Sequence, residues 1–95
     1  MRLVFDIESN HYDLSIIHTV HCIVAQDVDT EKVYEFVGDD IPEGVKFLES
    51  ATELIGHNII RFDIPAIQKF YPWFKPTATI SDTLIMSRLG KPKWF

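Results

Sequence analysis

The stretch Leu3-Val4-Phe5-Asp6-Ile7-Glu8 decides the fold. Its first half is apolar at every position, which is typical of a strand near the centre of a sheet whose two faces are both covered. Because side chains alternate along a strand, Asp6 and Glu8 share one face, while Phe5 and Ile7 share the other. The stretch therefore predicts a central first strand from which two carboxylates emerge together.

The sequence beyond this strand predicts a mixed sheet. Two further strands, at 20–26 and 32–37, are joined by a polar turn and indicate a hairpin. After them the apolar period changes to a helical one, and strands then alternate with helices. Antiparallel strands followed by parallel crossovers predict a single α/β domain with helices on the faces of its sheet. The remaining expected strands are 54–57 and 77–81, and the expected helices follow Asp40, run from Asp63 to about Tyr71, and run from Thr83 to Leu89.

Helix starts after the predicted hairpin are indicated by capping patterns. Asp40, with Pro42 in the first turn and Glu43 three residues on, resembles a capping arrangement. Asp63 and Asp82 stand where they would cap the next two helices by accepting first-turn amide hydrogen bonds. The apolar residues Val45, Leu48, Ala51 and Ile55 repeat at helical spacing after Asp40.

Composition and charge exclude several classes of protein. The chain has 95 residues, 46% of them hydrophobic, a single cysteine and a net charge of −5. Neither a secretory leader nor a membrane span is expected, and we expect a cytoplasmic protein. The charge is unevenly divided, because residues 1–60 carry −9 and residues 61–95 carry +4. The basic second part has aromatic residues interleaved, a pattern found both in surfaces that bind single strands and in ordinary solvated lysines beside core aromatics.

Two groups of residues are candidates for chemistry. Asp6 and Glu8 are hard oxygen ligands, and a divalent cation such as Mg²⁺ or Mn²⁺ would offset the repulsion between them. The alternative is that both simply reach solvent at the end of a strand. The second group is Asn58, Phe62 and Asp63. Each of these also has an ordinary structural explanation. Asn58 could be a turn residue, Phe62 a core aromatic and Asp63 a helix cap.

The joint spacing of these groups resembles a known family, the proofreading 3'-5' exonuclease domains of the ribonuclease H-like superfamily. Asp6-Ile7-Glu8 matches the acid-x-Glu motif on the opening strand of that family, and Asn58 through Asp63 matches its Asn-x-x-x-aromatic-Asp motif. The closest resemblance is to the N-terminal exonuclease domain of bacteriophage family A DNA polymerases. It extends through the Asp-Thr-Leu and Ser-Arg-Leu segment at residues 82–89 and spans nearly the whole chain.

The resemblance implies a fold and a reaction. The fold would be a ribonuclease H-like mixed sheet flanked by helices, truncated before the final helices. The activity would be removal of nucleoside monophosphates from the 3' end of single-stranded DNA, with two Mg²⁺ or Mn²⁺ ions. Asp6, Glu8 and Asp63 would be the catalytic metal ligands, and Asn58 and Phe62 would seat the substrate strand. If the chain is encoded by a phage, it would act in the cytoplasm of the bacterial host.

The third motif of the family, a Tyr or His followed by a fourth Asp on a later helix, has no counterpart after Asp63. We therefore expect residues 1–95 to be the N-terminal part of an exonuclease domain, without a polymerase domain and with little activity alone. In one hypothesis, a second chain supplies the missing motif and the polymerase domain. In the other, the chain is a truncated, non-catalytic module that binds nucleic acid or a replication partner.

Overall fold

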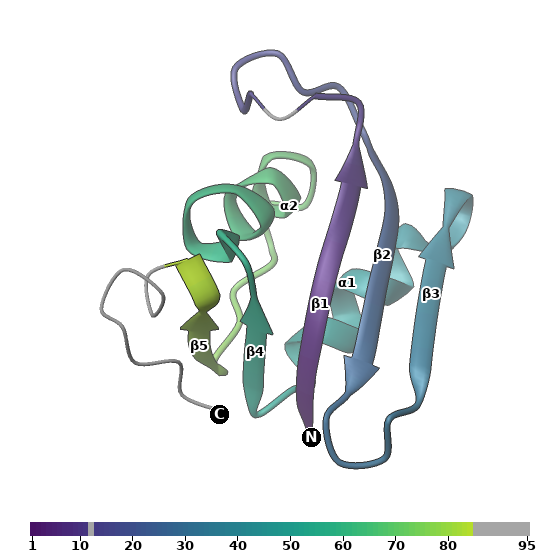
Figure 1. Cartoon of the computed structure of the whole chain (residues 1–95). Coiled ribbons are helices and arrows are strands. Elements are labelled where there is room, and N and C mark those ends of the chain that lie inside the picture. The colour runs from purple at the N-terminus through teal and green to yellow at the C-terminus, as the bar shows by residue number, and fades with distance from the viewer. Residues whose placement is uncertain (12, 85–95) are drawn as a thin grey trace.

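The computed structural model describes residues 1–11 and 13–84 (Figure 1). Five strands, two α-helices and two short helical turns follow one another along this part of the chain. In order they are β1 (Arg2–Ser9), β2 (Val20–Asp27), β3 (Val33–Val37), the 3-10 turn η1 (Gly38–Asp40), α1 (Ile41–Glu49), β4 (Glu53–Gly56), the π-helical turn η2 (Ile59–Asp63), α2 (Ile64–Phe70) and β5 (Thr79–Asp82).

The five strands form one mixed sheet in the order β3-β2-β1-β4-β5. β1 and β2 are antiparallel, with Asp6 opposite Val24, and β2 and β3 form an antiparallel pair. β1 and β4, and then β4 and β5, are parallel. The predicted hairpin, the central first strand and the change from antiparallel to parallel pairing are confirmed. The α/β class of the domain is therefore confirmed as well.

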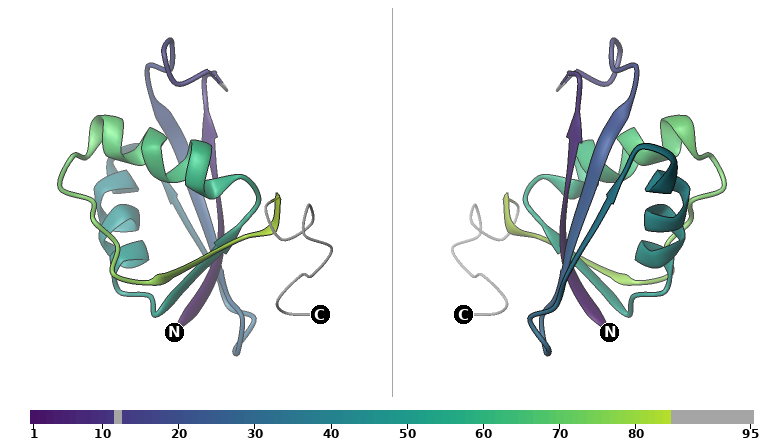
Figure 2. Two further views of the ribbon diagram at one scale, coloured as in Figure 1. Left: turned by 90° about the vertical axis from the view of Figure 1, so that its left-hand side faces the viewer. Right: turned by 90° about the vertical axis from the view of Figure 1, so that its right-hand side faces the viewer.

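The core lies between the sheet and both α-helices. On β1, Leu3, Phe5 and Ile7 are buried, and α1 and α2 bring Leu48 and Ile67 against the same face. Both helices lie on one side of the sheet (Figure 2). The expectation that β1 is covered on both faces is wrong for this part of the chain, because Val4, Asp6 and Glu8 on the opposite face are all exposed.

α1 begins directly after Asp40, as predicted, but the capping bond and the end of the helix differ from the prediction. Asp40 precedes the helix, but its side chain makes no capping hydrogen bond, because the 3-10 turn η1 leads directly into α1 and already places Asp40 in helical backbone geometry. The helix ends at Glu49, so Ala51 and Ile55 lie outside it although they continue its apolar spacing. Both are buried, and Ile55 belongs to β4, which shows that helical spacing also occurs by chance across an element boundary.

The last predicted helix is only partly described. Residues 83 and 84 are helical, and the rest of the expected helix, from 85 to 89, lies outside the described residues, as do the basic residues Arg88, Lys91 and Lys93. The strand expected at 77–81 is observed as β5, two residues later at its start. None of the helices in the described part combines the length and the apolar character that crossing a bilayer requires.

Candidate functional site

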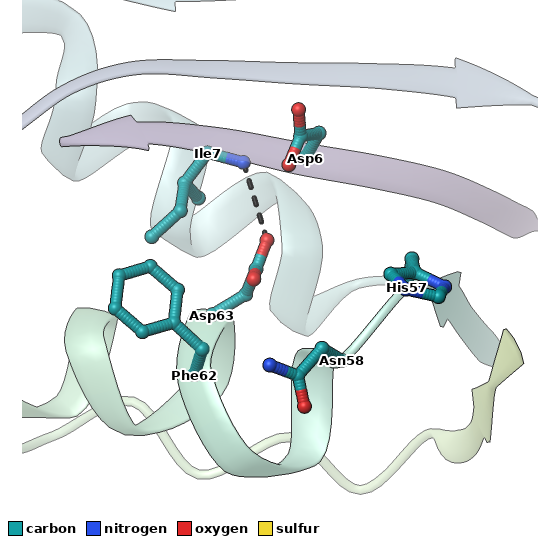
Figure 3. A pocket seen from close by; sticks show the side chains of 6 residues that line it. All are labelled: Asp6, Ile7, His57, Asn58, Phe62 and Asp63. Carbon is teal, nitrogen blue, oxygen red and sulfur yellow. Dashed lines mark hydrogen bonds between the residues drawn. The ribbon is translucent and has the colours of Figure 1, made fainter. Parts of the chain in front are cut away.

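A cavity of about 230 Å³ lies at the carboxyl ends of β1 and β4. These two strands are parallel neighbours, and the chain continues from them toward opposite edges of the sheet, from β1 to β2 and from β4 through α2 to β5. Such a divergence leaves a crevice at the ends of the strands, where ligands of open α/β sheets bind. The lining residues, drawn in Figure 3, are Asp6, Ile7, His57, Asn58, Phe62 and Asp63.

Four of the five predicted site residues therefore meet at one cavity, and Glu8 does not line it. Glu8 is exposed on the same face of β1 as Asp6, as the alternation predicted. It lies two residues further along, beside an irregularity in the β1–β2 register between Glu8 and Ser9. The two carboxylates therefore emerge on one face of the sheet, but only Asp6 reaches the cavity.

Asp63 is almost completely buried, with 4% of its surface exposed. It ends the π-helical turn η2, in which the N–H of Ile64 bonds to the carbonyl of Ile59, and such turns are frequent at functional sites. The expectation that Asp63 caps α2 is wrong, because its backbone is already helical and its side chain makes no capping hydrogen bond. Its Oδ2 instead accepts a hydrogen bond from the N–H of Ile7, at 3.3 Å.

The backbone N–H of Ile7 is free to bond to Asp63 because of the register between β1 and β4. β4 pairs with β1 only as far as Val4 opposite Ile55, so Ile7 lies beyond the end of this ladder. A buried backbone N–H without a partner is costly, and a buried carboxylate needs donors. The hydrogen bond between Ile7 and Asp63 satisfies both groups. It also attaches the start of α2 to the central strand.

The electrostatics of the cavity favour a proton or a cation. The pKa of Asp63 is raised to about 7, first by burial and then by the negative charge of Asp6, while the hydrogen bond from Ile7 opposes the rise. A smaller rise comes from the negative charge of Asp82. Two carboxylates close enough to repel each other, one of them buried, are stabilised by protonation or by a bound cation.

The acids at the cavity fit part of the ligand set of a hard metal ion. Carboxylate oxygens are the ligands that Mg²⁺ and Mn²⁺ prefer, so Asp6 and Asp63 fit these ions by their chemistry. Among residues 1–11 and 13–84, however, no three His, Cys, Asp or Glu side chains lie close enough together to hold a metal ion. The two acids therefore provide only part of a coordination sphere, and water, a substrate phosphate or another protein segment would have to provide the rest.

Asn58 occupies the turn that connects β4 to η2. Its backbone is left-handed, with φ 60° and ψ 30°, as its role as a turn residue predicts. Its side chain lies at the cavity, across from Asp63 (Figure 3). Phe62 also lines the cavity and is half-buried against the core, so its structural role and its proposed role as a substrate contact are compatible.

The buried carboxylate of Asp82 holds this turn in place. It accepts hydrogen bonds from the backbone N–H groups of Asn58 at 2.9 Å and Ile60 at 3.0 Å. It also accepts one from Leu84 at 2.9 Å, which confirms the predicted capping role at the end of β5. Asp82 does not line the cavity, and its contribution to the site is to position the residues that do.

His57 is a site residue that the sequence analysis missed. It lines the first cavity and also a second one, of about 520 Å³, together with Val4, Phe5, Asp6, Ile55, Gly56 and Thr83. Its Nδ1 forms a hydrogen bond with Oγ1 of Thr83, at 2.8 Å, which orients the ring. In the sequence, the only feature that pointed to His57 was its position next to Asn58. Being next to a motif residue does not by itself justify assigning a role.

The site thus combines two acids, an amide, an imidazole and an aromatic ring at the carboxyl ends of β1 and β4, and the two acids can hold part of the coordination sphere of a divalent cation. No protein-family model matches the chain, and no curated protein sequence matches it. The chemistry of the residues at the cavity is therefore the basis for a functional proposal.

Proposed function

We propose that this chain is a metal-dependent 3'-5' exonuclease module of the type found in bacteriophage DNA polymerases, with a ribonuclease H-like fold. It would hydrolyse the 3'-terminal phosphodiester of single-stranded DNA and release nucleoside monophosphates. The observation that carries the proposal is that Asp6 and Asp63, which are far apart in the sequence, line one cavity. Asn58 and Phe62, from the same motif as Asp63, line this cavity too.

The sheet supports the proposal. A hairpin at one end, a central first strand and parallel strands on the other side form the arrangement that led us to expect a ribonuclease H-like domain. The first acidic motif lies on the central strand, and the second lies on the turn after its parallel neighbour. Both motifs therefore end at the same edge of the sheet, where a substrate strand can reach them.

Each residue would have a separate task. Asp6 and Asp63 would hold Mg²⁺ or Mn²⁺, and Glu8, on the same face of β1 as Asp6, would contribute a further carboxylate to the ligand set. Asn58 has an amide that can donate to a phosphate or sugar oxygen. The ring of Phe62 can stack on the terminal base.

When bound, two such cations would supply an activated water and would stabilise the charge on the phosphorus and on the departing 3' oxygen. The residues of this chain contribute binding and orientation. Burial disfavours the ionised form of Asp63 when no opposite charge is near. A bound cation would stabilise the ionised carboxylate and allow it to act as a ligand.

The proposal includes a requirement for a further protein segment. No acidic residue follows Asp82 among residues 83–95, so these residues do not supply the third motif, which consists of a Tyr or His and a fourth Asp. A second chain that carries this motif, and with it the polymerase domain, would complete the ligand set and orient the attacking water. The chain by itself would be inactive or weakly active.

The test is digestion of 3'-labelled single-stranded DNA in Mg²⁺ by the full chain mixed with a separately produced C-terminal exonuclease segment. We expect release of monophosphates, with a loss of about a hundredfold or more for Asp6→Ala. Glu43→Gln, an exposed acid on α1 far from the motif residues in sequence, is the matched control and should retain activity. A mixture that stays inert, or an Asp6→Ala chain as active as the control, would overturn the proposal.

A second candidate is a non-catalytic module that binds single-stranded DNA or a replication partner. It is favoured by the finding that the described residues bring together no three metal ligands. Titration with Mn²⁺ by calorimetry separates the two candidates. Binding that is lost in Asp63→Ala supports the nuclease, whereas equal heats for the natural chain and Asp63→Ala would remove the metal site and leave the binding module.

A further inference from the structure

A second cavity adjoins the first one at the carboxyl ends of β1 and β4. Its volume of about 520 Å³ lies within the range of about 300–1,000 Å³ that is usual for small-molecule sites, whereas the first cavity has about 230 Å³. The two cavities share Asp6 and His57 among their lining residues. A ligand longer than one nucleotide can therefore extend from one cavity into the other past these two side chains.

The two cavities lie on different sides of the acids. Phe62 lines the first cavity and not the second, and Thr83 lines the second and not the first. Figure 3 shows Phe62 on one side of Asp6 and Asp63, and His57 on the other. The proposed function places the terminal base on Phe62 and the scissile phosphate at the cations that the two acids would hold. The nucleotide on the 5' side of that phosphate then lies on the side of the second cavity.

The surface of the second cavity has an apolar part and a polar part. Val4 and Ile55, opposite each other in the parallel register of β1 and β4, supply the apolar part, and Val4 is 43% exposed. The polar part comes from Asp6, His57 and Thr83. A nucleotide has the same division, because its sugar and base offer apolar surface and its phosphate offers acceptor oxygens. The cavity therefore fits a nucleotide by its chemistry.

His57 is held in a defined orientation where the two cavities meet. Its Nδ1 forms a hydrogen bond with Oγ1 of Thr83, at 2.8 Å. A hydroxyl can donate this bond, in which case the ring carries its proton on Nε2 and can donate it to a phosphate oxygen. Asp82, the neighbour of Thr83, accepts a hydrogen bond from the N–H of Asn58, the neighbour of His57. Two adjacent contacts therefore fix the donor before a ligand binds, which lowers the entropic cost of binding.

The charge of the second cavity is compatible with a phosphate once a cation is present. Asp6 is the one acid among the described residues that line it, and Glu8 lines neither cavity. In the proposed function Asp6 holds Mg²⁺ or Mn²⁺, whose positive charge offsets the repulsion between the carboxylate and a phosphate. A nucleotide in the second cavity would then meet a bound cation and a hydrogen-bond donor.

We propose that the second cavity binds the nucleotide on the 5' side of the scissile phosphate. Val4 packs against its sugar or base, and His57 donates to the phosphate that joins the two nucleotides. His57 is then a substrate contact, and Thr83 is a positioning residue that orients it. The inference rests on the proposed function for the direction of the strand, but occupancy of the cavity by a nucleotide is measured without hydrolysis.

The test compares two ligands on the full chain in Mg²⁺. The first is dTMP, which fills one nucleotide position. The second is the 5'-phosphorylated thymidine dinucleotide with a phosphorothioate linkage, which resists hydrolysis. We expect the dinucleotide to bind about tenfold more tightly and, in NMR, to shift the methyl signals of Val4, Ile55 and Thr83 more than dTMP does. Equal affinities, or shifts confined to residues outside the second cavity, would overturn the proposal.

A matched pair of variants locates the second nucleotide. Val4→Glu and Val33→Glu each place a carboxylate at an exposed valine, but Val33, on β3, is not among the residues that line either cavity. Val4→Glu should weaken dinucleotide binding about tenfold by repelling the phosphates, and Val33→Glu should not. Binding of dTMP should be the same in both variants and the natural chain, which also shows that the variants are folded. Equal loss of dinucleotide binding in both variants contradicts the proposal.

The role of Thr83 is tested through His57. Thr83→Val keeps the shape of the side chain and removes the hydroxyl, and we expect dinucleotide binding about fivefold weaker, with recovery in Thr83→Ser. His57→Ala should weaken binding by at least as much. Adding Thr83→Val to His57→Ala should then cause no further loss, because the hydroxyl acts only through the ring. Losses that add fully, or a Thr83→Ser chain as weak as Thr83→Val, would refute the positioning role.

The binding measurements are independent of the nuclease assay. Preferential dinucleotide binding that Val4→Glu abolishes, together with an inert completed mixture, would refute the exonuclease and retain the second nucleotide site. Hydrolysis by the completed mixture, together with equal affinities for dTMP and the dinucleotide, would refute the second nucleotide site alone.

Discussion

The carboxylate of Asp63 accepts a hydrogen bond from the backbone N–H of Ile7 in the centre of the domain, at 3.3 Å. Asp63 closes the turn before α2, and Ile7 lies on β1 beyond the last residue that pairs with β4. The bond brings the second acidic motif against the first. It also buries a carboxylate next to Asp6, and the consequences of this burial can be measured.

The stability of the domain should fall as pH rises from about 4 to about 7. Because the pKa of Asp63 is raised to about 7 in the folded chain, the folded state binds more protons than the unfolded state in this range. Stability then decreases with pH, by up to a few kcal/mol. Urea unfolding at a series of pH values should show a smaller decrease for Asp63→Asn. An unchanged slope would mean that Asp63 ionises normally.

Divalent cations should stabilise the natural chain above pH 7, where both acids at the cavity are charged. Binding to the folded state alone raises the unfolding free energy by about 2.7 kcal/mol when the ion is present at a hundred times its dissociation constant. Thermal unfolding with and without Mn²⁺ measures this gain. It should be lost in Asp6→Asn and Asp63→Asn and kept in Glu43→Gln. A gain of equal size in all four proteins would place the ion elsewhere.

Replacement of Asp82 should loosen the turn at Asn58. Asp82→Ala removes the acceptor of three backbone N–H groups, and a loss of about 2–4 kcal/mol is expected, because each buried donor left unpaired costs about 1–3 kcal/mol. Amide hydrogen exchange should accelerate at Asn58 and Ile60. Asp13→Ala removes an exposed carboxylate that accepts hydrogen bonds from the N–H and the hydroxyl of Ser15, and it should cost less than about 1 kcal/mol.

Gly56 should not tolerate a side chain. A Cβ at this position would lie 2.9 Å from the carbonyl oxygen of Phe5 and would also overlap the side chain of Ile59, so Gly56→Ala requires β4 to move away from β1. We expect a loss of about 1–3 kcal/mol in urea unfolding. Gly38→Ala is a useful comparison, because Gly38 has φ +57° and open space around it and should cost only about 1 kcal/mol through backbone strain. If Gly56→Ala were the milder change, the close approach of β4 to β1 would be wrong.

Local sequence patterns predicted the elements well where one period dominates. Alternation on the first strand correctly placed Asp6 and Glu8 on one face and Phe5 and Ile7 in the core. The helix starts were placed correctly, but the capping roles predicted for Asp40 and Asp63 were wrong. Each of these residues precedes an α-helix but is itself the last residue of a helical turn, and a residue already in helical geometry is poorly placed to cap.

The sequence by itself determined the mixed α/β sheet, the pair of acids on its central strand and the turn at Asn58, because these depend on residues that are neighbours along the chain. Only the tertiary structure decided that Asp63 bonds to Ile7, that His57 joins the cavity, that Glu8 does not line it and that both described helices cover the same face. These four results depend on where β4 stops pairing with β1 and on which side of the sheet each connection passes. Such relations arise from packing between distant segments, which no local pattern encodes.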